Sequence, residues 1–210
     1  DIAWLMQEGE WPDKSSFSSG SYKINQHESE LSKYLNMNGL TYDRISRNQL
    51  LNSNTKFKLL EVGSAKYKAL IIHNTDHILP ELYKKISDLA KSGVPIIFLG
   101  ELPSRASGFK DKEIRDTSIL NLNKSIVDDL EIINEMSEIR DFLEPLINQK
   151  LFTDDDVNLH VRVNKRDCNN EKILFLFNSS GEPIDYKFDI GSEYLNVNIF
   201  NPYDLSLIHI

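Results

Sequence analysis

The segment from His73 to His77, with the sequence HNTDH, holds more groups capable of chemistry than any other part of the chain. It lies at the carboxyl end of residues 68–73, an apolar run of strand length. Crevices at strand ends of α/β sheets hold ligands. Two imidazoles and the Asp76 carboxylate are groups that bind transition metals. No further ligand stands at a matched spacing, so the alternative is a polar loop that caps the next helix. We predict no metal and no cofactor here.

Glu101 lies at a second predicted strand end, just after the apolar run 94–99. A glycosidase needs two carboxylates facing one sugar, and Asp76 with Glu101 is the only pair that the strand order could bring together. Polar loops at strand ends are common in α/β layers, and most of them do no chemistry. We therefore predict no catalytic residue. His73, Asp76, His77 and Glu101 remain candidates for carbohydrate contact.

Two tryptophans could stack on a sugar. Trp4 lies inside the apolar run 1–6, where a buried core position is the simpler interpretation. Trp11 lies beside the Ser/Gly-rich segment 12–21, which has no apolar periodicity and predicts a loop. Trp11 is therefore the better candidate for carbohydrate contact.

Nucleotide binding and covalent catalysis lack their sequence signatures. The chain has neither a dinucleotide-binding glycine pattern nor a P-loop. The strand ends at residues 70–75 and 98–102 carry no Cys or Ser on a glycine-flanked elbow, which a nucleophile would need. Cys168, the single cysteine, lies far from both and cannot form an internal disulfide.

The net charge and the lengths of the apolar stretches exclude some classes of partner. The 210-residue chain has a formal net charge of −8, which gives it no overall attraction for nucleic acid or anionic lipid. No apolar stretch is long enough to cross a bilayer. The chain begins at Asp1 with no initiator methionine and no visible signal peptide. We expect a fragment of a longer protein.

The order of apolar patterns predicts an α/β domain over residues 1–150, with a doubly wound and mostly parallel sheet. Its strands read as continuous apolar runs, so both faces of the sheet should be covered by helices. Residues 101–116 lack an apolar period and predict a surface loop, followed by helical segments to about residue 150. The expected strands are 1–6, 41–46, 57–62, 68–73 and 94–99, and the first two helices are 24–38 and 80–92.

Beyond the acidic residues 154–156 the pattern changes to short strands, which predicts a small antiparallel β module over residues 151–210. Residues 164–170 look like an insertion between its first two strands. Four strands leave an apolar face that needs a cover, so we expect the module to continue beyond the sequence. The expected strands are 157–163, 172–177, the latter as a buried run, 186–190 and 194–200.

These segments resemble a known family in their order. Residues 40–45 (LTYDRI), 67–72 (YKALII) and 91–100 (KSGVPIIFLG) are similar to the amidotransferase-like domain of large α-L-rhamnosidases of glycoside hydrolase family 106. Residues 160–162 (HVR) with 172–178 (KILFLFN), and then 200–202 (FNP), resemble the family's following β segment.

The resemblance implies a class I glutamine amidotransferase-like domain followed by the start of a β-sandwich. It implies that the catalytic carboxylates and any calcium site belong to a barrel that precedes residue 1, in a periplasmic or extracellular bacterial enzyme. The expected partners are that barrel and carbohydrate. Residues 204–210 look like translated sequencing-adapter read-through, so we expect them not to be native.

Three alternatives stay open. The first is that the chain is the matching domain of a β-galactosidase-like enzyme, since similar amidotransferase-like domains accompany trimer-forming β-galactosidases. The chain could also be a carbohydrate-binding accessory module that works through Trp11, the loop 101–110 and the strand-end polar residues. A third alternative is a small-molecule enzyme that uses His73 and Asp76 with a metal.

Overall fold

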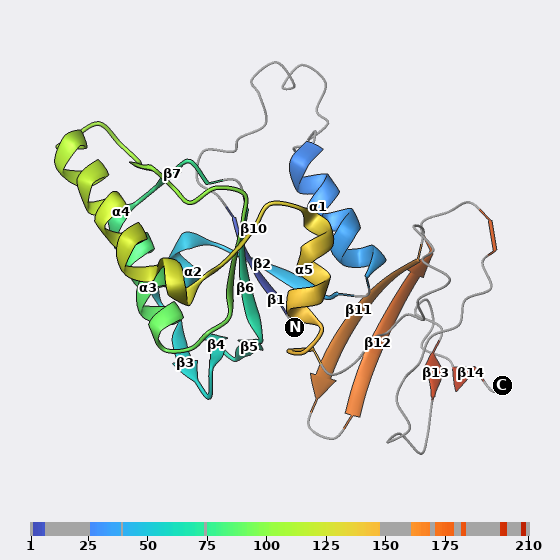
Figure 1. Ribbon diagram of the computed structural model, residues 1–210. Helices are drawn as coiled ribbons and strands as arrows, with labels where there is room; N and C mark the ends of the chain where they lie inside the picture. Colours follow the sequence, from blue (N-terminus) through green and yellow to red (C-terminus); the bar gives the residue numbers. More distant parts are fainter. Residues whose placement is uncertain are drawn as a thin grey trace.

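The computed structural model describes residues 2–6, 26–38, 40–73, 75–147, 161–168, 171–178, 182–183, 198–200 and 207–208. Within these ranges the chain forms a five-stranded parallel sheet with helices on both sides, and separate antiparallel segments (Figure 1). The predicted α/β class with a mostly parallel sheet is confirmed.

The parallel sheet has the strand order β10-β8-β6-β1-β2. Counted in chain order among these five strands, the order is 2-1-3-4-5, which is one of the two common arrangements of doubly wound sheets. The switch in winding direction falls between β1 and β6, which are neighbours. The strands are β1 (Ile2–Leu5), β2 (Tyr42–Ile45), β6 (Ala69–His73), β8 (Ile96–Leu99) and β10 (Glu131–Ile133).

Both faces of the sheet are buried, because alternate strand residues enter two separate apolar clusters. One cluster joins Leu5, Ile72 and Phe98 to α3 (Pro80–Lys91) and α4 (Lys112–Ile126). The other joins Trp4, Ile71 and Leu99 to α1 (Gln26–Met37) and α5 (Met136–Leu143). The expectation that helices cover both faces is confirmed, and so is the core position of Trp4, whose exposed fraction is 4%.

Local signals set the ends of the helices. α3 has Pro80 in its first turn and Lys91 in its last, and Gly93 follows at φ +85°, a left-handed conformation that glycine adopts without strain. The short helix α2 (Arg47–Leu51) begins with a capping box: Ser46 N–H donates to Gln49 Oε1 (2.8 Å), and Gln49 N–H donates to Ser46 Oγ (3.3 Å).

A three-stranded antiparallel meander precedes β6, where we predicted one strand over residues 57–62. It consists of β3 (Asn54–Lys56), β4 (Leu59–Val62) and β5 (Ala65–Tyr67). Phe57 and Lys58 form the first turn with φ of +53° and +64°, the signs of a type I′ turn. Gly63 opens the second turn at φ +61°. The prediction was wrong at its start, because residues 57 and 58 are the turn.

Two predictions between residues 101 and 133 were wrong. The segment 101–116 is not all loop, because β9 (Arg105–Ala106) pairs with β7 (His77–Ile78) and α4 already begins at Lys112. Residues 131–133, predicted as part of a helical stretch, form β10, the edge strand beside β8. A single 3₁₀ turn, η2 (Val127–Asp129), separates α4 from that strand.

The antiparallel module is described in part. β11 (Val161–Cys168) pairs with β12 (Glu171–Asn178), so most of the expected insertion at 164–170 is regular strand. The run 172–177 was predicted to be buried, and this is wrong, since Ile173 and Leu176 are exposed. β13 (Ile199–Phe200) pairs with β14 (Leu207–Ile208). The expected strand 186–190 lies outside the described residues, and the boundary at residue 150 stays a prediction.

Replacing the Phe57-Lys58 turn with Asn-Gly should stabilise the protein. Non-glycine residues at positive φ are strained, whereas Asn-Gly is the favoured type I′ pair, so we expect F57N/K58G to raise the free energy of unfolding by about 1 kcal/mol. Urea unfolding measures the change. Gly63→Ala is the matched control in the neighbouring turn and should lower the same free energy by about 1 kcal/mol. An unchanged or lower stability of F57N/K58G would contradict the strain.

Candidate functional site

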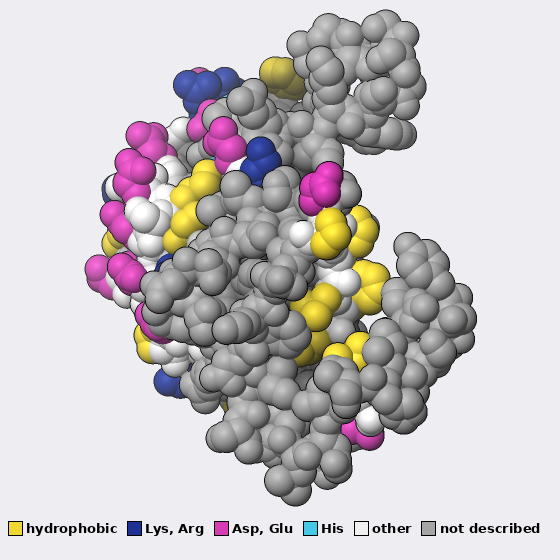
Figure 2. Space-filling model, turned by 90° about the vertical axis from the view of Figure 1, so that its right-hand side faces the viewer, with side chains coloured by type: hydrophobic (Ala, Val, Ile, Leu, Met, Phe, Trp, Pro, Cys, Tyr) yellow, Lys and Arg dark blue, Asp and Glu magenta, His cyan; other side chains and the backbone are white. Residues whose placement is uncertain are grey.

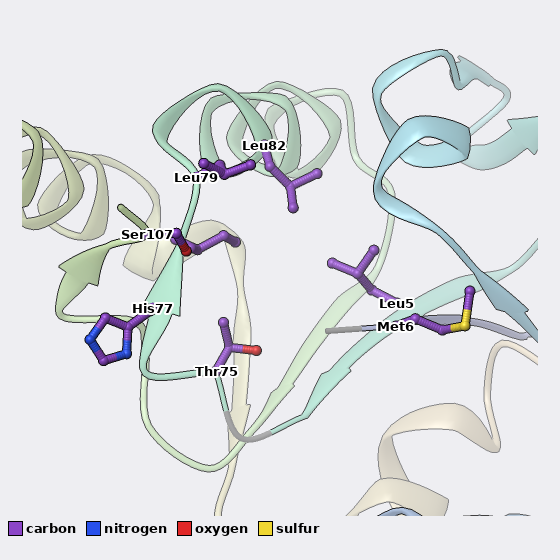
Figure 3. Close-up of a pocket in the computed structure, with 8 residues that line it drawn as sticks. Leu5, Met6, Thr75, His77, Leu79, Leu82 and Ser107 are labelled. Carbon is purple, nitrogen blue, oxygen red and sulfur yellow. The ribbon is translucent and has the colours of Figure 1, made fainter. Parts of the chain in front are cut away.

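A shallow crevice lies at the carboxyl end of the sheet, at the switch point between β1 and β6 (Figure 3). α1 packs on one face of the sheet and α3 on the other, so the elements that follow β1 and β6 diverge at this end of the sheet. The enclosed cavity is small, about 20 Å³, and the rest of the crevice is open to solvent. Its lining residues are Leu5, Met6, Thr75, His77, Ile78, Leu79, Leu82 and Ser107.

Backbone hydrogen bonds fix the two loops that form one wall of the crevice. The Asp76 carbonyl accepts from the N–H groups of Ser104 (3.2 Å) and Arg105 (3.3 Å). Ser107 N–H donates to the Ile78 carbonyl (3.0 Å). The loop after β6 and the loop after β8 are thereby joined, and Ser107 is held at the crevice although it is far from β6 in sequence.

Among the residues that the structure describes, the lining is mainly aliphatic and includes no Asp, Glu, Lys or Arg. Leu5, Ile78 and Leu82 belong to the buried core, so the floor of the crevice is the edge of that core. Thr75 is buried, and its hydroxyl donates to the His73 carbonyl (3.3 Å). Ser107 supplies a second hydroxyl group. The described part of the lining is therefore an apolar surface with two hydroxyl groups at its edge.

The predicted strand-end cluster is only partly brought together. His77 lines the crevice, but its ring lies on the side of β7 away from Leu5 and Met6 (Figure 3). His73 is buried at the end of β6 and does not line the crevice. Asp76 and Glu101 are exposed and also lie outside the lining. Trp11 lies outside the described residues.

The groups needed for the alternative chemistries do not meet at this edge. Among the described residues, no three His, Cys, Asp or Glu side chains come close enough to hold a metal ion. No hydrogen bond between described residues joins the imidazole of His77 to the hydroxyl of Ser107, so the two do not form an activated nucleophile.

Residues that the sequence analysis missed form most of the site. Leu5 and Met6 follow from the rule that ligands bind at the switch point, once the strand order is known. Thr75 was part of the HNTDH segment but was passed over because it is neither a metal ligand nor an acid. Ser107 lies in the segment 101–116, which was predicted to be a loop, and the pairing of β7 with β9 brings it to the crevice.

Comparison with protein-family models, with curated proteins and with solved structures finds no match to this chain. In the part of the chain that the structure describes, no helix combines the length and the apolar character that crossing a membrane requires.

A partly buried network of polar side chains holds the loop that carries Ser107. Tyr83 on α3 is fully buried, and its hydroxyl donates to Oδ1 of Asn123 on α4. Asn123 Nδ2 in turn donates to the Pro103 carbonyl (3.0 Å). The Asp116 carboxylate accepts from the Ala106 N–H (2.7 Å). α3 and α4 thereby position the segment 103–107 through side-chain bonds, and burial raises the pKa of Tyr83 above its ordinary value.

Tyr83→Phe should destabilise the protein most at neutral pH. The substitution leaves Asn123 Oδ1 without its donor, which we expect to lower the free energy of unfolding by about 1–3 kcal/mol at pH 7. Because the folded pKa of Tyr83 is raised, its contribution is complete below the unfolded pKa of about 10 and declines as the pH rises above it. The gap between wild type and variant should therefore narrow above pH 10.

Urea unfolding of both proteins between pH 7 and pH 11 measures that gap. All other titrating groups are shared by the two proteins, so the difference isolates Tyr83. A gap that stays constant or widens above pH 10 would contradict the assignment of the raised pKa to this hydroxyl.

Proposed function

We propose that this chain is a non-catalytic, amidotransferase-like α/β domain with an attached β-sandwich segment, from a larger glycoside hydrolase resembling the α-L-rhamnosidases of family 106. Its role is to pack against other domains of that periplasmic or extracellular enzyme. The glycosidic bond is cleaved by a barrel outside this chain.

The exposure of the apolar strand β12 is the main support for the proposed interface role. Large apolar side chains along it are about half exposed, and hydrophobic atoms lie at the surface on this side of the molecule (Figure 2). Contiguous apolar surface of this kind marks contact with another protein surface. The exposed fractions are 55% for Ile173, 53% for Phe175, 43% for Leu176 and 52% for Phe177.

Exposure on both faces of β12 strengthens this argument. Successive strand residues point to opposite faces, so Phe175 and Phe177 lie on one face and Leu176 lies on the other. β11 is the partner strand of β12 among the described residues. An isolated two-stranded ribbon is marginally stable in water, and β12 needs further layers to become an ordinary strand.

The chemistry of the crevice supports the non-catalytic part of the proposal. Glycoside hydrolysis uses two carboxyl groups that flank the bond to be cleaved. No carboxylate of the described residues lines the crevice, and Asp76 and Glu101 lie exposed outside it. The parent enzyme is proposed from the resemblance of the sequence segments to family 106, and a parallel sheet followed by antiparallel strands is the order of elements that this resemblance implies.

The purified chain should not hydrolyse a rhamnoside. We expect 4-nitrophenyl α-L-rhamnoside to release nitrophenol at the rate of the buffer blank, because no carboxylate of the described residues lines the crevice. The measurement is absorbance of nitrophenolate over a day at high protein concentration. Turnover that disappears in Glu101→Gln or Asp76→Asn would overturn the proposal, since the active carboxylates would then lie in this chain.

The β12 surface should dominate binding of an apolar dye. We expect F175S/F177S to lower the fluorescence of bound 8-anilinonaphthalene-1-sulfonate by roughly half or more, because the dye reports contiguous apolar surface. The matched control is F57S/F109S, which removes two phenylalanines that are more exposed, at 87% and 96%, and lie outside β12. Equal losses in the two double variants would show that β12 is not a distinct apolar surface.

A further inference from the structure

We propose that the exposed apolar surface of β12 docks on a second copy of this chain, at the β10 edge of its parallel sheet. This rests on the interface role proposed above and names the partner, because the domain that covers β12 is then the α/β domain of another copy. The β12 surface consists of Ile173, Phe175, Leu176 and Phe177. The edge surface consists of Leu120, Val127 and Ile132 with the carboxylates of residues 128–144.

Three large apolar side chains are partly exposed along the path from α4 to β10. Leu120 and Val127 are seven residues apart, and Val127 ends α4 with helical backbone angles, so the two lie on the same side of the helix. Ile132 lies on the α4 face of the sheet, because its neighbour Ile133 enters the cluster on the other face. The exposed fractions are 47% for Leu120, 42% for Val127 and 38% for Ile132.

The same part of the chain is strongly acidic. Residues 127–144 contain seven acidic side chains and one basic side chain, so most of the excess negative charge of the chain lies here. The apolar side chains beside these carboxylates give a protein partner surface to bury, which a purely solvated acidic face would lack. All seven carboxylates are exposed, and they belong to Asp128, Asp129, Glu131, Glu135, Glu138, Asp141 and Glu144.

The hairpin of β11 and β12 has the complementary composition. Residues 161–178 contain four basic and two acidic side chains, together with the half-exposed apolar side chains of β12. Opposite charges favour one pairing of surfaces over others, while apolar burial supplies most of the free energy of an interface. The chain therefore carries both halves of one contact.

The two halves do not cover each other within one copy. Phe175 and Phe177 on one half and Val127 and Ile132 on the other all remain exposed. A contact between two different surfaces of identical chains is heterologous, so each bound copy still has one open surface, and assembly continues unless a ring closes. The edge surface is small, so we expect a weak contact with a dissociation constant of about 100 µM.

Sedimentation velocity of the purified chain tests the association. Between about 10 µM and about 1 mM, we expect the weight-average sedimentation coefficient to rise continuously with concentration. Raising the ionic strength from about 0.05 M to about 0.5 M should weaken the association at least about threefold, because salt screens the charges at the contact. A chain that stays monomeric over the whole range, or that associates equally well at both ionic strengths, would overturn the proposal.

Two variants, each defective in one surface, test which surfaces meet. F175S/F177S removes the centre of the β12 surface, and D128K/D129K reverses charge on the edge surface. Each alone should associate at least about tenfold more weakly than the wild type. Mixed in equal amounts, the two should form a heterodimer and nothing larger, because the intact edge of the first variant binds the intact β12 of the second.

The matched control is E81K/D88K, which makes the same change in net charge at two exposed positions of α3. This variant should associate like the wild type. All substituted side chains are exposed, so the fold should be retained, and circular dichroism checks this. Undiminished association of either single-surface variant, or a mixture of the two that stays monomeric, would refute the pairing of β12 with the β10 edge.

Failure of this pairing is distinguishable from failure of the proposed function. A monomeric wild type in which F175S/F177S still loses more dye fluorescence than F57S/F109S would keep the interface role of β12 and remove only its partner. Equal losses of dye fluorescence would remove the interface role itself. Hydrolysis of a rhamnoside would remove the non-catalytic assignment and leave the sedimentation result standing.

Discussion

The burial of both faces of the parallel sheet is the constraint on which the rest of the structure depends. Every residue of β6 from Ala69 to His73 is buried, and so is every residue of β8. A polar group placed within these strands would be desolvated without a partner at a cost of about 1–3 kcal/mol. Reactive or binding groups can therefore stand only where the strands end, and the crevice lies at one of those ends.

The same constraint explains which strands the sequence predicts. β1, β6 and β8 are continuous apolar runs because both their faces are covered, and each was predicted within one or two residues. β10 was missed because it is short and only its last residue, Ile133, is buried. The start of α4 was missed because Ile114 is 75% exposed, so the apolar residues of its first turn do not follow the periodicity of a buried face.

The composition of the candidate site could be predicted only in part, because it depends on contacts between segments far apart in sequence. The HNTDH segment was correctly placed at a strand end. Which of its members faces the crevice is decided by the pairing of His77 with Arg105, which fixes the direction of the loop. Thr75 is turned inward as a result and Asp76 outward, although the sequence marks the aspartate as the more reactive residue.

β6 and β12 carry the same sequence signal, an apolar run of strand length, and yet Ile71 is fully buried while Phe175 is half exposed. The difference lies in the layers around them. Helices of this chain cover β6 on both faces, whereas the described residues provide β12 with one neighbouring strand. An apolar run records that a strand is to be buried and says nothing about what buries it.

For β12, the neighbouring residues give a further indication of the covering surface. Residues 161–178 include four basic and two acidic side chains, in a chain whose net charge is −8. This net-basic composition, together with the exposed apolar side chains of β12, would complement a surface that is both apolar and acidic, because apolar burial supplies most of the free energy of an interface while charge favours one partner over another.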